Sequence, residues 1–335
     1  MRTRLIKVSP SGKPNSAITE AARFIKAGEV VAFPTETVYG LGADAMNAKA
    51  VKKIFEAKGR PADNPLIVHI SGLNQLDSVV SEINDSAQNL IDSFWPGPLS
   101  IVMKKNQKVP NITTAELDTV VIRFPSHPIA QALISAAGTP IAAPSANLSG
   151  KVSPTKAKHV VSDLNKKIPI VIDGGPIKYG LESTVVDCTG EHPVILRPGS
   201  ITYEMIKTVV PDIENLSKKS ELRSPGMKYR HYATETPITL FTGQPKATGI
   251  KIKKYLAGQD VNKLIVLWHD GDFSKLPNHF KLPANAYEAA PILFDTMRGV
   301  DMAAEQIIIQ GYPPEGIGAA VMNRLEKAAT EIIEA

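Results

Sequence analysis

Residues 29–42, EVVAFPTETVYGLG, contain the pattern from which the fold of this chain can be inferred. Residues 29–33 form a short, mostly apolar run with β-branched and aromatic side chains, which is typical of a buried strand. Two hydroxyls, a carboxylate and a phenol follow in the PTETVY segment, on a predicted loop just beyond that strand. α/β proteins commonly bind ligands at such loops. A turn whose hydroxyl groups bond only to their own backbone explains the segment equally well.

The same alternation continues from residue 28 to about residue 205, where short β-branched runs are separated by segments with helical periodicity. This arrangement predicts one large α/β domain built on a mixed sheet with flanking helices. One helix is expected over residues 50–57, with Gly59 as a left-handed cap and Pro61 to stop it. The predicted strands are residues 29–33, 66–70, 99–103, 120–124, 140–143, 168–172, 183–187 and 194–197.

A second, smaller α/β pattern occupies the C-terminal part of the chain. Between the two patterns, residues 212–236 are polar and lysine-rich and show no period, which is typical of a linker. We therefore expect a large domain over 1–211, a linker over 212–236 and a small domain over 237–335. The small domain should contain strands at 237–241, 263–268 and 306–310, a helix around 284–297 and a last helix from about Gly318. In that last helix, apolar residues recur at helical spacing at Ala319, Met322, Leu325, Ala329 and Ile332.

Composition limits the class of protein. The 335 residues exceed what one core usually supports, and a hydrophobic fraction of 43% with 21% charged residues is typical of a soluble globular chain. No stretch approaches the roughly 18 apolar residues of a membrane span, and the N-terminus lacks the apolar core of a secretory signal. We expect a cytoplasmic protein that does not bind a membrane.

Charge and cysteine content narrow the chemistry further. The formal charge of +5 suits anionic ligands, either nucleotide phosphates or a nucleic acid, without deciding between them. Cys188 is the single cysteine, which excludes an intrachain disulfide and a cysteine-based zinc cluster. Its neighbours predict a buried position on a strand rather than a catalytic thiol.

Two familiar nucleotide-binding motifs do not apply. Residues 40–45, GLGADA, match the GxGxxA pattern, but six residues separate them from the preceding predicted strand, where the motif should open a helix directly. No GxxxxGK[ST] sequence occurs in the chain. ATP would therefore have to bind without a Walker A loop.

The KGRP segment places Lys58 and Arg60 at the end of the predicted helix. Two cations at a helix end can simply complement the helix dipole. That explanation is weakened by the NPLIVH segment that follows, because Asn64 and His69 lie at the two ends of a short predicted strand. Four polar groups thus occur within a dozen residues.

The segment APSANLSG, residues 143–150, also follows an apolar strand. Ser153 and Pro154 then have the form of an N-cap serine with proline at the first helical position, which predicts a helix start there. Such a start is either an ordinary cap or a site suited to a phosphate. Arg123 and Arg197 each end an apolar strand, and each by itself is weak evidence for a site.

Together these segments resemble the two-domain threonylcarbamoyl-AMP synthases, whose larger part is a YrdC-like domain. The resemblance covers nearly the whole chain, and it implies a YrdC-like twisted mixed sheet plus a smaller Rossmann-like α/β domain. Two residues depart from the family's usual pattern: Ser100, at a position where threonine is frequent, and Thr234, at a position where proline is usual. The segments that carry the resemblance are PTETVYGLG, KGRP, NPLIVH, WPGPLS at 95–100, APSANLSG, ESTVVD at 182–187, LRPGSIT at 196–202, SPGMKYRHYA at 224–233 and the C-terminal GIGAAVMNRLEKAA.

The resemblance also implies a set of site residues. The threonine site would consist of Thr37, His69, Arg123, the Ala143 backbone and Ser183. The ATP site would consist of Lys58, Arg60, Asn64, Thr119, Ser145, Asn147, Ser153, Arg197 and Tyr232. Within that set, the catalytic residues would be the family's KxR and SxN pairs, Lys58 with Arg60 and Ser145 with Asn147. Glu36 is interpreted either as a water-mediated contact or base, or as a structural residue of its loop.

The implied reaction joins L-threonine, bicarbonate or CO2 and ATP into threonylcarbamoyl-AMP and pyrophosphate. No dedicated metal ligands are expected, because the sequence shows no compact acidic cluster and the phosphates would supply most ligands of Mg²⁺. The product would pass to a downstream threonylcarbamoyl-transferase complex, with tRNA as an indirect partner. Two alternatives remain: a non-catalytic module that binds double-stranded RNA, and a carbamoyl-adenylate-forming enzyme of hydrogenase maturation, whose usual acylphosphatase and zinc-finger modules are absent from this sequence.

The segment from Ser224 to Tyr232 is unusual for a passive linker, because it combines aromatic and cationic side chains. We expect it to act as a lid over the nucleotide, since a carbamate and its anhydride with AMP hydrolyse unless water is excluded. Packing of the aromatic rings between the domains is the alternative explanation.

Overall fold

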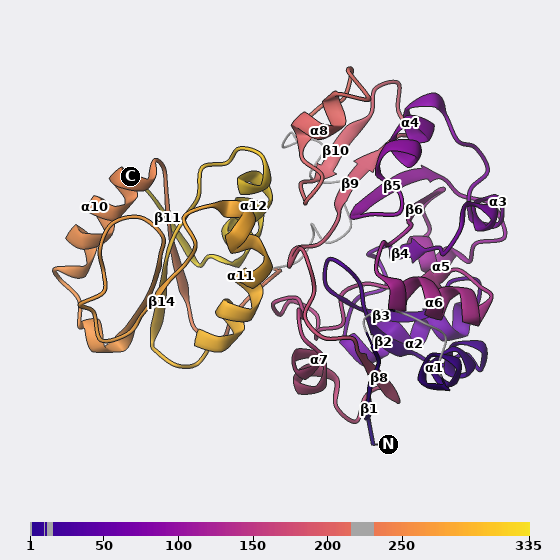
Figure 1. The fold of residues 1–335 in the computed structure, drawn as a ribbon, viewed down its shortest axis with the longest axis horizontal. Coiled ribbons are helices and arrows are strands. Elements are labelled where there is room, and N and C mark those ends of the chain that lie inside the picture. Colours follow the sequence, from indigo (N-terminus) through magenta and orange to yellow (C-terminus); the bar gives the residue numbers. More distant parts are fainter. Residues whose placement is uncertain (1, 10, 12–15, 216–230) are drawn as a thin grey trace. The chain divides into compact units, whose positions relative to one another are not determined.

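The computed structural model describes residues 2–9, 11, 16–215 and 231–335 (Figure 1). These residues divide into two compact units. The larger unit contains the described residues of 1–149 and 153–215, and the smaller contains residues 150–152 and 231–335. Most of the predicted lid and linker, from residue 216 to residue 230, lies outside the described residues. The exact domain limits therefore stay a prediction.

A ten-stranded mixed sheet organises the larger unit, as the sequence predicts. Its strand order is β1-β8-β2-β3-β7-β4-β6-β5-β9-β10, with parallel pairs such as β4 with β6 and antiparallel pairs such as β5 with β6. The strands are β1 (Arg4–Lys7), β2 (Val31–Pro34), β3 (Tyr39–Asp44), β4 (Ile67–His69), β5 (Leu99–Lys104), β6 (Thr119–Arg123), β7 (Ile141–Ala142), β8 (Ile170–Asp173), β9 (Thr184–Asp187) and β10 (Val194–Arg197).

Helices cover both faces of this sheet, which is why its strands are apolar on both sides. Val31 and Phe33 of β2 belong to one hydrophobic cluster with α1 and α6, whereas Ala32 between them belongs to another with α2, α4 and α7. This alternation follows from the two-residue period of a strand. The helices are α1 (Ser16–Lys26), α2 (Ala48–Lys58), α3 (Leu76–Val79), α4 (Asp85–Phe94), α5 (Asn111–Thr114), α6 (Pro128–Ala137), α7 (Ala157–Leu164) and α8 (Tyr203–Lys207), with a 3₁₀ turn at Leu73–Gln75.

The PTETVYGLG segment is not one loop, which corrects the sequence-based expectation. Only residues 35–38 form the turn, and Tyr39–Asp44 is strand β3, antiparallel to β2. Glycine is required inside this strand by close packing: a Cβ at Gly42 would lie 2.5 Å from Ile141 and 2.6 Å from Phe33. The GLGADA sequence therefore lies on a strand and opens no helix, consistent with setting the dinucleotide motif aside.

The helix start predicted at Ser153 is also wrong. Helix α7 begins at Ala157, and Lys156 occupies the capping position without a side-chain cap bond. The carbonyl of Pro154 accepts a hydrogen bond from the N–H of Tyr39, so residues next to Ser153 are held against β3 and cannot enter the helix. By contrast, the end of α2 is as expected, because Gly59 adopts a left-handed conformation with φ of +60°.

The smaller unit is a parallel five-stranded sheet with the order β13-β12-β14-β11-β15, which confirms the Rossmann-like α/β prediction. The last helix ends at Ala328, so including Ala329 and Ile332 in it was wrong; Ile332 lies in β15. The short edge strands β13 and β15 are mostly exposed and lack the apolar run of a central strand. The elements are β11 (Ile238–Thr242), α10 (Pro245–Leu256), a 3₁₀ turn (Val261–Lys263), β12 (Leu264–Trp268), β13 (His279–Lys281), α11 (Ala286–Val300), β14 (Gln306–Gln310), α12 (Ile317–Ala328) and β15 (Glu331–Glu334).

Among the described residues, no helix is both long and apolar enough to cross a membrane.

Candidate functional site

Strand register brings three expected threonine-site residues together. Arg123, the last residue of β6, is paired with His69 of β4 on one side and with Ser100 of β5 on the other. Ser183 directly precedes β9, whose first residue is paired with Leu99 of β5. All four polar side chains are buried. The sheet therefore builds a row of polar groups that are far apart in the sequence.

Arg123 joins this row to the turn at residues 35–38. Its Nη1 donates to Thr37 Oγ1 at 2.8 Å, its Nη2 forms an ion pair with Glu36 Oε1 at 2.7 Å, and its Nε donates to the Gly97 carbonyl at 3.4 Å. Each terminal nitrogen keeps one further N–H, because a guanidinium carries two on each. Arg123 can therefore bind an anion while it holds the turn in place.

Glu36 is the buried counter-ion of Arg123. Burial by itself would raise the pKa of Glu36, but the Arg123 guanidinium outweighs it and holds that pKa below its usual value. A carboxylate with a lowered pKa is a weak proton acceptor, so the ion pair favours the structural interpretation of Glu36 over the base.

His69 is neutral at physiological pH. Burial, followed by the neighbouring Arg123 cation, lowers the pKa of His69 to about 3. Its Nδ1 lies 3.1 Å from the Ile67 carbonyl, and its ring meets the edge of Phe33 with centroids 6.4 Å apart. His69 can therefore exchange neutral hydrogen bonds with a ligand but adds no charge.

Ser183 connects this row to a second group of residues. Its hydroxyl lies 2.8 Å from the Ser100 hydroxyl and accepts from Arg197 Nη2 at 3.1 Å, while Arg197 Nε donates to the Ser183 carbonyl at 3.1 Å. Ser183 is thus shared between the expected threonine site and an expected ATP residue.

Three cations of the expected ATP site influence one another. Burial lowers the pKa of Arg60 to about 10; Asp63 opposes this shift and the Arg197 cation adds to it. Burial, with repulsion from Arg60, also lowers the pKa of Lys58 well below its usual value, against the opposing influence of Asp163. These mutual effects indicate a concentrated positive potential, which suits a polyphosphate.

Lys58 also shapes the SxN loop. Its Nζ donates to the carbonyls of Ser145 and Asn147 at 2.5 and 2.6 Å, so the KxR and SxN motifs are in direct contact. Ser145 pairs in turn with Gly40 in an isolated bridge. Arg60 Nη2 lies 3.4 Å from the Asn64 carbonyl. The two motifs and Asn64 therefore form one group.

Three further residues are placed differently. Thr119 lies at the other end of β6 from Arg123, about 13 Å away at ~3.3 Å per residue. Ser153 donates to Glu182 Oε1. Tyr232 belongs to the smaller unit, where its ring stacks on Phe294 with centroids 5.4 Å apart. The expected contacts of these residues with ATP stay predictions.

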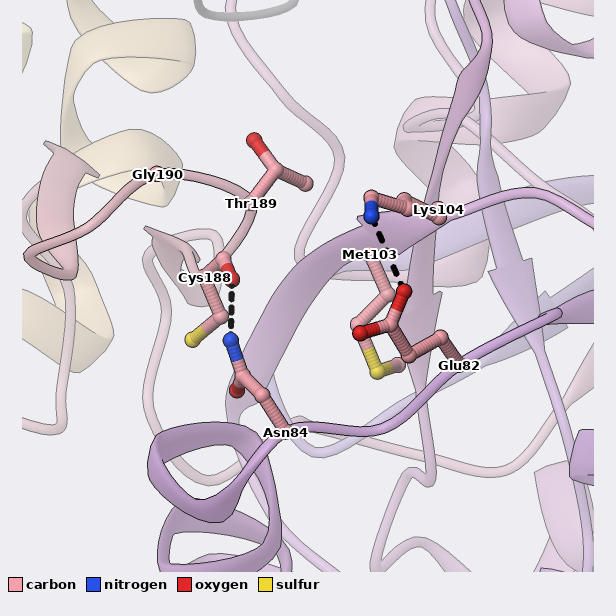
Figure 2. Close-up of a pocket in the computed structure, with 7 residues that line it drawn as sticks. All are labelled: Glu82, Asn84, Met103, Lys104, Cys188, Thr189 and Gly190. Atoms are coloured by element: carbon pink, nitrogen blue, oxygen red, sulfur yellow. Dashed lines mark hydrogen bonds and ion pairs between the residues drawn. The ribbon is translucent and has the colours of Figure 1, made fainter.

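A separate cavity of about 220 Å³ lies at the far end of β5 from Ser100 (Figure 2). Lys104 and Glu82 form an exposed ion pair of 2.9 Å beside it, and Asn84 donates to the Cys188 carbonyl. Burial, followed by Asp187, raises the pKa of the Cys188 thiol to about 12, so the thiol stays protonated and unreactive. None of the expected site residues lines this cavity.

Within the described ranges, no group of three or more histidine, cysteine, aspartate or glutamate side chains could hold a metal ion.

Sequence reasoning did not assign Thr35 or Ser100 to the site. Both side chains are buried and each contacts an expected threonine ligand. Ser100 reaches Ser183 only through the fold, whereas Thr35 and Thr37 are two residues apart in the same turn.

Comparison with known proteins identifies relatives that cover most of the chain. Residues 23–199 match the Sua5, YciO and YrdC family model, described as "Telomere recombination", and residues 201–330 match the C-terminal domain of threonylcarbamoyl-AMP synthase. Threonylcarbamoyl-AMP synthase of Bacillus subtilis is 47% identical over 93% of this chain and 92% of its own, and that of Pyrococcus abyssi is 46% identical over 92% and 93%. The crystal structure of P. abyssi Sua5 complexed with L-threonine superposes with a TM-score of 0.93 at 43% identity, over 99% of this chain and 100% of that one.

Proposed function

Because the chain belongs to the threonylcarbamoyl-AMP synthase family, we propose that it combines L-threonine, bicarbonate or CO2 and ATP into L-threonylcarbamoyl-AMP and pyrophosphate, with one water released when bicarbonate is the carbon source. The observation that carries this proposal is the shared Ser183. It joins a buried row suited to an amino acid, with Arg123 and His69, to a cationic group suited to a polyphosphate, with Arg197.

The amino-acid part is assigned as follows. Arg123 binds the threonine carboxylate with its remaining N–H groups, because a planar guanidinium fits a carboxylate at two points. Thr37, His69 and Ser183 surround the rest of the molecule. The N–H of Ala143 already donates to the Ile67 carbonyl at 2.8 Å, so the Ala143 backbone would contact the substrate through its carbonyl.

The nucleotide part is assigned to Arg60, Arg197 and the Lys58-supported loop of Ser145 and Asn147. Asn64, Thr119, Ser153 and Tyr232 complete the expected ATP contacts. Mg²⁺ would arrive with ATP and be held mainly by its phosphates, and removal of Mg²⁺ with EDTA should abolish turnover.

The residues suit adenylyl transfer without a protein nucleophile. The amine of threonine combines with bicarbonate or CO2 to give a carbamate, whose oxygen attacks the α-phosphorus of ATP while pyrophosphate leaves. Catalysis then requires two anions to be held in line and phosphate charge to be stabilised, for which arginine, lysine and hydroxyl groups are suited.

Omission of single substrates tests the reaction. The purified full-length chain should release pyrophosphate from ATP only when threonine and bicarbonate are both present, without RNA. Equal release without threonine would contradict the assignment. An RNA-binding module would release none, and an enzyme that forms carbamoyl-adenylate would require a carbamoyl donor in place of threonine. Transfer to tRNA would require a separate threonylcarbamoyl-transferase complex.

A further inference from the structure

Two pairs of buried hydroxyl groups lie beside the arginines of the site. Thr35 and Thr37 have their Oγ1 atoms 2.9 Å apart, and Ser100 and Ser183 have their Oγ atoms 2.8 Å apart. None of the four side chains is more than 2% exposed. Thr37 and Ser183 are two of the expected threonine ligands. Thr35 and Ser100 each contact one of these two hydroxyls.

The hydroxyl of Thr35 orients the hydroxyl of Thr37. Thr35 Oγ1 lies 2.6 Å from the Val38 carbonyl, and since a carbonyl only accepts, Thr35 donates its one proton there. In the contact between the two hydroxyls Thr37 is therefore the donor, and Thr35 Oγ1 also accepts from the N–H groups of Thr37 and Val38, each at 3.2 Å. One lone pair of Thr37 accepts from Arg123 Nη1, and the other remains. In this arrangement, Thr37 offers a ligand its remaining lone pair.

In the serine pair, the hydroxyl next to the ligand has the opposite role, because Ser183 acts as a hydrogen-bond donor where Thr37 offers a lone pair. Ser183 Oγ already accepts from Arg197 Nη2. In the part of the chain that the structure describes, the side chain of Ser100 has one hydrogen-bond partner, which is Ser183. A buried Ser100 proton therefore has an acceptor only if Ser100 donates to Ser183, and a buried donor without an acceptor is costly. Both lone pairs of Ser183 are then occupied, and Ser183 can only donate to a ligand.

We propose that Thr35 and Ser100 are positioning residues that fix the hydrogen-bond polarity of the amino-acid site, an inference that rests on the proposed function. A carboxylate only accepts, so it fits the proton of Ser183 together with the N–H groups of Arg123. The ammonium and hydroxyl groups of a free hydroxy-amino acid can donate, so they fit the remaining lone pair of Thr37. The two pairs thus select the orientation of the bound amino acid.

Ser100→Ala and Ser100→Thr test the serine pair in the full-length chain. Ser100→Ala should weaken L-threonine binding, measured by calorimetry, by about tenfold, because Ser183 is no longer held as a donor. Ser100→Thr keeps the hydroxyl and should bind within about threefold of the wild type. Ser81→Ala is the matched control, since the exposed Ser81 hydroxyl donates to a carbonyl at the far end of the same strand.

L-threoninamide distinguishes polarity from mere packing. Its amide replaces the acceptor-only carboxylate, so the wild type should prefer threonine strongly. In Ser100→Ala the dissociation constant for L-threoninamide divided by that for threonine should shrink several-fold. The reason is that the Ser183 hydroxyl is no longer held in the orientation in which it donates to the ligand. An unchanged ratio with weaker binding of both compounds would reveal only a packing defect and overturn the proposal.

Thr35→Ser and Thr35→Ala provide a second, independent pair. Thr35→Ser retains the proton that bonds to Val38 and should bind threonine like the wild type, whereas Thr35→Ala should bind it more weakly. Wild-type affinity in both alanine variants would overturn the inference and leave the proposed function intact. If the wild type itself neither binds threonine nor releases pyrophosphate, the proposed function fails and the inference falls with it.

Discussion

At the scale of single residues, the pair of Glu36 and Arg123 is the main electrostatic feature of the site. Both side chains are at most 4% exposed, so the two charges have lost most of their hydration. Such a pair adds little net stability, but the removal of one partner leaves a buried charge uncompensated. The two residues must therefore be considered as a unit.

Glu36→Gln should lower the free energy of unfolding by about 3–5 kcal/mol, measured by urea denaturation. Glu29→Gln is the matched control, because Glu29 forms an ion pair of 2.6 Å with Lys53 in which both side chains are about two-fifths exposed. That exposed pair should contribute no more than about 1 kcal/mol. Equal losses in the two variants would show that the buried pair has no special role.

The lowered pKa of His69 predicts how the stability of the folded chain depends on pH. Its pKa is about 3 in the folded chain and 6.5 for an ordinary histidine, so between these values the unfolded chain binds more protons. The free energy of unfolding should therefore fall as the pH is lowered below 6.5, with His69 contributing up to about 1.4 kcal/mol per pH unit.

The variant His69→Gln isolates that contribution. Its unfolding free energy, measured by urea denaturation from pH 7 to pH 5, should decline less steeply than that of the wild type. Some decline should remain, because burial also lowers the pKa values of His127 and His269. Parallel pH profiles for the two proteins would contradict the charge state assigned to His69.

At the scale of elements, the end of α2 decides where Arg60 lies. Gly59 adopts a φ of +60°, and no atom lies within 4 Å of the position that its Cβ would take. A substitution there acts through backbone strain alone, without a steric clash. The left-handed residue turns the chain out of the helix, and Arg60 follows it directly.

Gly59→Ala should cost about 1 kcal/mol of stability through the left-handed backbone. It should also raise the KM for ATP, because Arg60 follows the cap. Gly258→Ala is the control, since Gly258 also has open space around it but not a positive φ. That change should not destabilise the chain in thermal melts. Similar melting temperatures for both variants would show that the left-handed cap is unstrained.

At the scale of the whole molecule, each unit contains one of the two tryptophans. Trp95 lies in the larger unit and Trp268 in the smaller. The variants Trp268→Phe and Trp95→Phe therefore report, by fluorescence, the unfolding of one unit at a time. All the expected threonine ligands belong to the larger unit.

L-threonine should raise the melting temperature reported by Trp95, because a ligand stabilises the folded unit that binds it. At about 100 times its dissociation constant the added stability is ~2.7 kcal/mol. The transition reported by Trp268 should stay within error of its value without ligand. An increase in melting temperature that only Trp268 reports would place the amino-acid site in the smaller unit and contradict the prediction.

The sequence alone determined the fold class, most strands and the location of most site motifs. Long β-branched runs and capped helices such as α2 are local patterns, so they can be predicted from the sequence without knowledge of tertiary contacts. The resemblance then supplied the family and the expected ligands. The local prediction failed at β3, where the glycine-containing GLG sequence was expected to form a loop, although Gly42 is required there by close packing between strands.

Only the tertiary structure decided which polar groups touch. Strand register placed Ser100 beside Arg123, and the same sheet brought Ser183 within reach of both Ser100 and Arg197. The helix start expected at Ser153 was lost because Pro154 bonds to β3 instead. Each of these outcomes depends on hydrogen bonds between residues far apart in the sequence, which no local pattern of residues encodes.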